Sequence, residues 1–125
     1  MKSLPIILVV LIASVFFTQK NSGGYKSIPQ DQAKKMMDNG NVIILDVREK
    51  DEYDTGHIKG AVLLPVGSIN ADTAAKVIVS KDSVVLVYCR SGNRSKKASS
   101  ALAKLGYKNI CEFGGITTWK YDVEF

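Results

Sequence analysis

The sequence is poor in the residues from which metal centres and histidine-dependent active sites are built. It contains one histidine, His57, and two cysteines, Cys89 and Cys111, which are well separated along the chain. Zinc sites in proteins use several cysteine and histidine ligands at short spacing, and no such cluster occurs here. The composition therefore offers little support for a bound metal, and we expect neither a metal nor a cofactor.

Long apolar runs are also scarce. The one extended apolar stretch, Leu4 to Phe17, is shorter than the roughly twenty residues that a membrane-spanning helix needs. It follows Lys2 and precedes a small and polar segment that ends at Gly24, a pattern typical of a secretory signal peptide. We therefore interpret residues 1–24 as a signal peptide, or as an N-terminal anchor and membrane tether if it is retained. The protein is predicted to be exported, either periplasmic or secreted.

No block of like charge dominates the chain, whose formal net charge is +5. Residues 1–24 contribute Lys2 and Lys20 and no acidic residue, so their removal lowers the net charge to +3. The remaining 101 residues suffice for one domain with a hydrophobic core but not for two. The basic residues are scattered, which favours a small anion over a nucleic acid as the partner. The exception is a group around Cys89: Arg90, Arg94, Lys96 and Lys97.

Short apolar segments alternate with amphipathic ones after residue 24. Strands are predicted at residues 42–45, 61–64, 84–88 and 108–113, and helices at about 28–39, 70–78 and 94–105. Gly114-Gly115 is expected to break the last strand, and residues 116–121 to form a closing helical turn. Nearly apolar strands that alternate with helices predict an α/β fold with a parallel sheet covered on both faces.

Cys89 stands at the end of one of these strands, directly before the start of a helix. The intervening loop supplies backbone N–H groups and arginines, and together with the positive end of the helix these favour a thiolate over a thiol. Cys89 is therefore the candidate nucleophile; the alternative is a buried structural cysteine. The candidate substrate-binding loop consists of Arg90, Ser91, Gly92, Asn93, Arg94 and Ser95.

Two parts of the chain together resemble a single-domain rhodanese over about residues 25–121. The first comprises Leu45-Asp46-Val47-Arg48-Glu49, Glu52-Tyr53, Gly56-His57-Ile58, Gly60-Ala61 and Leu64-Pro65. The second comprises Tyr88-Cys89-Arg90-Ser91-Gly92-Asn93-Arg94-Ser95, Gly106-Tyr107, Gly114-Gly115-Ile116 and Trp119. The resemblance implies five parallel strands flanked by helices, a persulfide-forming cysteine and thiosulfate sulfurtransferase activity.

The hypothesised reaction moves sulfur from a small sulfur anion to a thiol, cyanide or a protein thiol through a persulfide on Cys89. Both Arg90 and Arg94 could attract the donor. Two alternatives stay open. One is a persulfide carrier or docking module with little turnover. The other is a cysteine phosphatase or arsenate reductase. The loop of this chain resembles the loop of that class but is one residue shorter, so the phosphatase arginine falls where this chain has Ser95.

Several other residues have structural interpretations. Asp46 and Arg48 should lie at the same sheet edge as Cys89, and we expect an ion pair that supports the loop rather than a catalytic role. His57 is expected to be hydrogen-bonded and half-buried, and Tyr53 and Trp119 to belong to the core. Cys111 is expected to be a buried thiol, the alternatives being a resolving role or a disulfide with Cys89.

The triplet Asn93-Arg94-Ser95 also fits the acceptor pattern for N-glycosylation. A glycan at this position would block the predicted loop. We therefore expect an unmodified asparagine, as in an exported bacterial protein.

Overall fold

The computed structural model describes residues 24–125. The predicted signal segment therefore lies outside the described residues, apart from its last residue, Gly24. Within the described part, none of the helices has the length and apolar character needed to cross a membrane.

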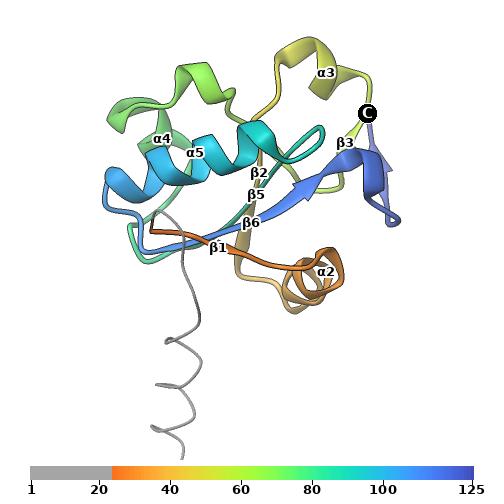
Figure 1. Ribbon diagram of the computed structural model, residues 1–125, viewed down its shortest axis with the longest axis horizontal. Coiled ribbons are helices and arrows are strands. Elements are labelled where there is room, and N and C mark those ends of the chain that lie inside the picture. Colours follow the sequence, from red (N-terminus) through yellow and green to blue (C-terminus); the bar gives the residue numbers. More distant parts are fainter. Residues whose placement is uncertain (1–23) are drawn as a thin grey trace, which may run out of the picture.

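Five parallel strands form the central sheet, in the order β1-β6-β5-β2-β4 (Figure 1). This arrangement confirms the predicted α/β fold. The strands are β1 (Lys26–Ser27), β2 (Val42–Asp46), β4 (Val62–Leu63), β5 (Val84–Cys89) and β6 (Asn109–Gly115). A two-stranded antiparallel sheet, β3 (His57–Ile58) with β7 (Val123–Glu124), lies at one end of the molecule.

Helices cover both faces of the sheet, as predicted. In Figure 1, α4 (Ala71–Val77) and α5 (Asn93–Lys104) lie above the sheet and α2 (Gln30–Asn39) lies below it. The short helix α3 (Lys50–Asp54) lies beyond the end of β2. Two single turns of 3-10 helix, η1 (Val66–Ser68) and η2 (Ile116–Thr118), complete the fold.

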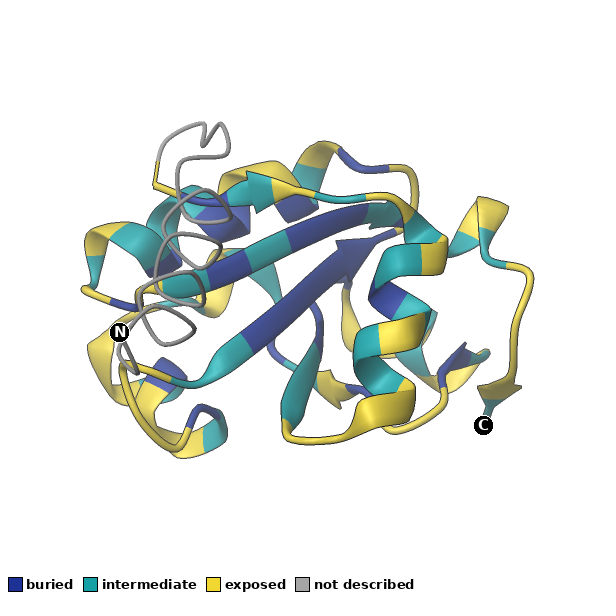
Figure 2. Ribbon diagram, turned by 90° about the horizontal axis from the view of Figure 1, so that it is seen from below, coloured by how far each residue is buried: buried dark blue, intermediate teal, exposed yellow. Residues whose placement is uncertain are grey.

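Each face of the sheet has its own hydrophobic core, and β5 contributes to both. Val85, Val87 and Cys89 pack with α4 and α5, whereas Leu86 and Tyr88 pack on the α2 side. Successive side chains of a strand point to opposite faces, so a strand covered on both faces must be apolar throughout. Figure 2 accordingly shows the middle of the sheet as the most deeply buried part of the molecule.

The prediction that Gly114-Gly115 breaks the last strand is wrong. Strand β6 continues through both glycines to Gly115, which pairs with Cys89 after a register shift between Val87 and Cys89. Gly114 adopts a φ of 93°, which a residue without a side chain tolerates at a bulge. The irregularity therefore does not end the strand, and β6 continues to the end of β5.

Three short strands and the C-terminal segment also differ from expectation. The helical turn predicted over residues 116–121 is limited to η2, and the last strand of the chain is β7 rather than β6. The sequence gives no signal for β1, β3 and β7, because two residues are too few to show a periodicity. Only tertiary pairing, such as that of β1 with β6, makes these segments strands.

A buried polar network joins β2, β5 and β3. The Tyr88 hydroxyl donates a hydrogen bond to Asp46, and accepts one from the Ile58 N–H at 3.0 Å. Burial first, and then the bond to Asp46, raise the pKa of Tyr88 above its usual value, so the hydroxyl remains a donor. Arg48 pairs with Asp46 at 2.7 Å and donates to the Gly56 carbonyl at 2.8 Å.

Replacing Tyr88 with Phe should lower the free energy of unfolding by about 1–3 kcal/mol, because the buried Asp46 carboxylate and Ile58 N–H each lose a partner. Urea denaturation followed by circular dichroism measures this change. Tyr107→Phe is the control, since Tyr107 is also buried but its hydroxyl is not part of the network. Equal stability of the two variants would contradict a stabilising role for the network.

Candidate active site

Cys89 combines deep burial with hydrogen-bond donors directed at its sulfur. The residue is 1% exposed, and the Gly92 N–H lies 3.0 Å from Sγ. Burial raises the pKa of the Cys89 thiol, but the nearby Ser95 hydroxyl and the amides of Ser95, Gly92 and Ser91 outweigh this effect. The net effect is a lowered pKa, which favours the nucleophilic thiolate.

The loop that follows Cys89 turns its backbone amides inward at the start of α5. Gly92 is the N-cap residue, with a φ of 112° that favours glycine, and no side chain caps the helix. The first N–H groups of α5 thus remain available to an anion next to the sulfur, and the helix dipole acts in the same direction. These residues form the cradle, by which we mean Cys89 to Ser95.

The back of the cradle rests on the backbone of β6. A Cβ atom added to Gly115 would lie 1.9 Å from the Arg90 carbonyl oxygen and 2.6 Å from the Ser91 Cα. Real Cβ atoms do not approach backbone atoms so closely, so any side chain here would displace the loop. Gly115, which the sequence analysis treated as a strand breaker, is required for this close approach.

Glu112 is a buried acidic residue beneath the cradle that the sequence analysis missed. It is 2% exposed and lies on β6. Its carboxylate accepts hydrogen bonds from the Ser27 hydroxyl at 2.7 Å, the Ser95 hydroxyl at 2.9 Å and the Gly114 N–H at 2.8 Å. It thereby links β1, β6 and the cradle. The available signal was an acidic residue within the otherwise apolar run of residues 110–113.

Arg94 is already engaged by an acidic residue. Its guanidinium forms a bidentate pair with Glu52 on α3, with N–O distances of 2.7 and 3.0 Å. The bond from Arg94 is the main reason why the pKa of Glu52 is lowered to about 2. The pair ties α3 to the start of α5, and it leaves Arg94 less free to bind a substrate.

The unpaired positive charges near the cradle come from Arg90, Lys96 and Lys97. All three are exposed, and none forms an ion pair with another residue of the described range 24–125. The Lys96 Nζ lies 3.8 Å from the point that a Cβ on Gly92 would occupy, which places this ammonium at the cradle. Arg90 and Lys96 are therefore better placed than Arg94 to attract an anion.

Asp46 and Arg48 lie at the carboxyl edge of β2, as the sequence suggested, and they form an ion pair. Both are buried, and their charged groups bond to each other, to Tyr88 and to Gly56. Burial lowers the pKa of Arg48, but the bonds to Asp46 outweigh this effect and leave it raised. The geometry supports a structural role for this pair next to the site.

His57 packs against the aromatic ring of Tyr53 rather than against the cradle. The His57 ring stacks on Tyr53 with centroids 3.7 Å apart, and its Nδ1 lies 3.0 Å from the Tyr53 carbonyl oxygen. Tyr53 and Trp119 pack, partly buried, against the core on the α2 side. In residues 24–125 no group of three potential metal ligands occurs.

The two cysteines are free thiols on opposite faces of the sheet. Cys89 belongs to the core beneath α4 and α5, whereas Cys111 packs against the core on the α2 side. Burial raises the pKa of Cys111. The sheet thus separates the thiols, so neither the disulfide nor a resolving role for Cys111 receives support.

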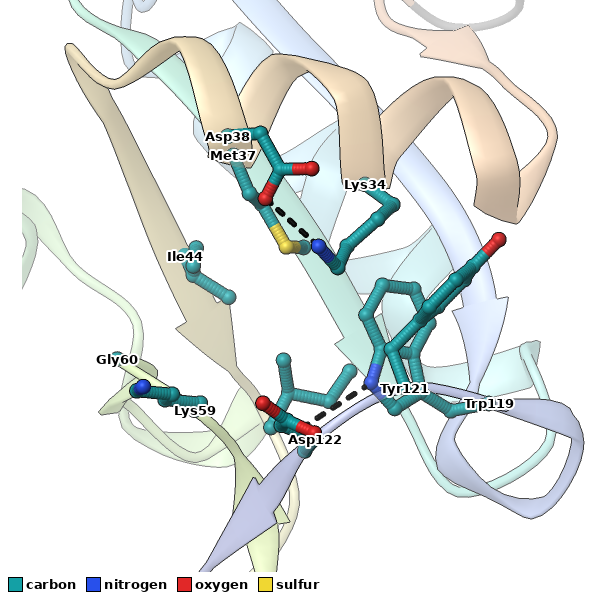
Figure 3. A pocket seen from close by; sticks show the side chains of 10 residues that line it. Lys34, Met37, Asp38, Ile44, Lys59, Gly60, Trp119, Tyr121 and Asp122 are labelled. Carbon is teal, nitrogen blue, oxygen red and sulfur yellow. Dashed lines mark hydrogen bonds and ion pairs between the residues drawn. The ribbon is translucent and has the colours of Figure 1, made fainter.

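A cavity of about 370 Å³ lies on the α2 side of the sheet (Figure 3). Its lining includes the aromatic side chains of Trp119 and Tyr121 and the ion pair Lys34–Asp38, and none of the cradle residues lines it. The cavity is therefore separate from the cysteine chemistry. Its lining residues are Lys34, Met37, Asp38, Ile44, Ile58, Lys59, Gly60, Trp119, Tyr121 and Asp122.

The part of the chain that contains the cradle also matches a known protein family. Residues 29–122 match the model of the rhodanese-like domain. The chain belongs to this family. Thiosulfate sulfurtransferase GlpE of Coxiella burnetii is 31% identical over 97 residues, which cover 77% of this chain and 88% of that protein. The tRNA uridine(34) hydroxylase of Photorhabdus laumondii is 28% identical over 102 residues, but this chain covers only 28% of its length.

Solved structures show the same domain. A rhodanese from E. coli, determined with anions, superposes with a TM-score of 0.61 at 27% identity, covering 66% of this chain and 95% of that one. The BH2092 protein of Bacillus halodurans superposes with a TM-score of 0.71 at 30% identity, covering 81% and 77%. These similarities confirm the resemblance to a single-domain rhodanese and the fold that it implied.

Replacing Gly115 with Ala should make Cys89 less reactive, because the new methyl group would push Arg90 and Ser91 away from β6. We expect the alkylation of Cys89 by iodoacetamide at neutral pH to slow about tenfold, as loss of the amide donors raises the pKa of the thiol by about one unit. Mass spectrometry of the Cys89 peptide measures the rate separately from Cys111.

Gly67→Ala is the matched control, because a Cβ on Gly67 would meet no atom within 4 Å. Alkylation of Gly115→Ala at the wild-type rate would show that the loop does not depend on this close approach.

Proposed function

We propose that this protein is a sulfurtransferase that moves a sulfur atom from an anionic donor such as thiosulfate to a thiophilic acceptor. The observation that carries this proposal is the Cys89 sulfur, buried among amide donors that favour its anionic form. The relative GlpE, named thiosulfate sulfurtransferase, supports the same chemistry. The relative named tRNA uridine(34) hydroxylase matches this chain over only 28% of its own length. Because relatives with different names share the domain, the donor and acceptor named here are a proposal.

The reaction is a double displacement at sulfur. The Cys89 thiolate attacks the outer sulfur of thiosulfate, the sulfur–sulfur bond breaks, and sulfite leaves with the bonding electron pair. Cyanide or an acceptor thiolate then attacks the outer sulfur of the Cys89 persulfide, and the cysteine leaves as a thiolate. No proton transfer to the leaving group is needed, because sulfite is a stable anion. This fits a site in which the only histidine, His57, has a structural position.

The size and charge of the cradle favour a single sulfur atom over a phosphoryl group. Four residues separate Cys89 from Arg94, and Arg94 is bound to Glu52. At the next position Ser95 is buried, uncharged and bonded to Glu112. Neither position 94 nor position 95 therefore offers a free arginine to hold the peripheral oxygens of a phosphate. These features speak against the phosphatase and arsenate reductase alternatives.

Thiosulfate incubated with the full chain should add one sulfur atom to the protein, and subsequent addition of cyanide should yield thiocyanate. Intact mass spectrometry and a colorimetric thiocyanate assay measure the two steps. Cys89→Ser should abolish both signals, whereas Cys111→Ser, on the other face of the sheet, should retain them.

Two results would revise the proposal, one from this assay and one from a separate phosphatase assay. A sulfur adduct without turnover, but with transfer to a protein thiol, would instead indicate a persulfide carrier. Hydrolysis of p-nitrophenyl phosphate without any sulfur adduct would contradict sulfur transfer.

Lys96 should contribute to the attraction of an anionic reagent to Cys89. Iodoacetate is anionic and iodoacetamide is neutral, so the ratio of their rates at Cys89 reports the local electrostatic potential. We expect Lys96→Gln to lower this ratio about two- to fivefold at low ionic strength, since an ammonium at short range attracts the anion. Lys97→Gln, one position further along α5, should change it less. An equal effect of the two substitutions would indicate only the net charge of the helix.

A further inference from the structure

The carbonyl group of Arg90 is held on the outer side of the cradle by Thr117. The Thr117 N–H donates to this oxygen at 3.2 Å, and the Thr117 hydroxyl donates to it at 3.1 Å. Thr117 lies in η2, directly after the strand on which the loop rests. Its hydroxyl bonds to the cradle from a segment 27 residues away along the chain.

The orientation of this carbonyl determines where the next amide points. In a trans peptide the C=O and N–H groups point to opposite sides of the same plane, and the protein contains no cis peptide bond among the described residues. Because the Arg90 oxygen faces Thr117, the Ser91 N–H faces the other way, toward the interior of the cradle. The Ser91 amide is one of the donors that lower the pKa of Cys89.

We propose that Thr117 is a positioning residue for the cradle: it holds the Arg90–Ser91 peptide plane so that the Ser91 N–H is directed at the Cys89 sulfur. The same amide would donate to the persulfide, and that second role rests on the proposed function. Gly115 allows the loop to approach, and Thr117 sets the rotation of the peptide once it is there.

The test relies on variants that leave every charge around Cys89 unchanged. The charged groups around the cradle include Arg90 in the loop and Arg94 and Lys96 on α5, together with Glu52 on α3 and Glu112 on β6. Thr117→Val keeps the shape of the side chain and removes only the hydroxyl. Thr117→Ser restores a hydroxyl. Both positions 117 and 118 are exposed.

The rate of iodoacetamide alkylation of Cys89, measured against pH, is the main readout. In Thr117→Val we expect the midpoint to rise by about 0.3–0.5 pH unit, which slows alkylation about two- to threefold below the midpoint, because a weakened amide bond stabilises the thiolate less. Thr117→Ser should return the midpoint to the wild-type value. Thermal unfolding of each variant separates this effect from a loss of stability.

Thr118→Val is the matched control. The Thr118 hydroxyl donates to the Gly115 carbonyl at 3.3 Å and makes no bond to the loop, so the midpoint should not move. If Thr117→Val fails to fold, Thr117→Ala carries the same test without the β-branched side chain. A wild-type midpoint in Thr117→Val, or a shift of equal size in Thr118→Val, would overturn the proposal.

Alkylation requires no sulfur donor, so this inference and the proposed function can fail independently. A shifted midpoint together with no thiosulfate activity would retain the role of Thr117 and reject the donor. Normal sulfur transfer with an unshifted midpoint would retain the proposed function and reject the role of Thr117.

Discussion

The structure around the site depends on the cost of placing a charged sulfur in a nearly buried position. A buried anion is unfavourable unless hydrogen-bond donors replace the water that it loses. Cys89 meets this requirement through backbone amides rather than through a cation in direct contact. The need to direct these amides at one atom accounts for the left-handed conformation of Gly92 and for the absence of a side chain at Gly115.

Two acidic residues complete the support of the cradle from different sides. Glu112 receives the Ser95 hydroxyl from below, and Glu52 holds Arg94 at the side. Each interaction connects the first turn of α5 to another element, so the end of the loop that enters the helix is fixed from two sides. Because Glu52 neutralises Arg94, the positive potential available to an anion comes from exposed side chains that can move with the ligand. The exposed cations thus attract the anion, whereas Glu52 and Glu112 hold the loop in position.

Much of this arrangement could be predicted before the structure. The apolar run before Cys89 predicted a central strand, and Asn39-Gly40 predicted the end of α2, which Gly40 caps with a φ of 81°. The predictions failed where the local signal was weak or shared. Glycines mark both strand ends and bulges, so Gly114-Gly115 did not reveal that β6 continues. An acidic residue in a strand gives no indication of its partners, so Glu112 was missed.

The sequence by itself determined the alternation of strands and helices, the position of the candidate nucleophile at a strand end and the family to which the chain belongs. These properties follow from hydrophobic periodicity and short motifs, which act over a few neighbouring residues. Only the tertiary structure decided which arginine is free, which face each thiol occupies and which segment orients the loop. Each of these depends on residues far apart in the chain, and their contact arises when the sheet brings the ends of its strands together.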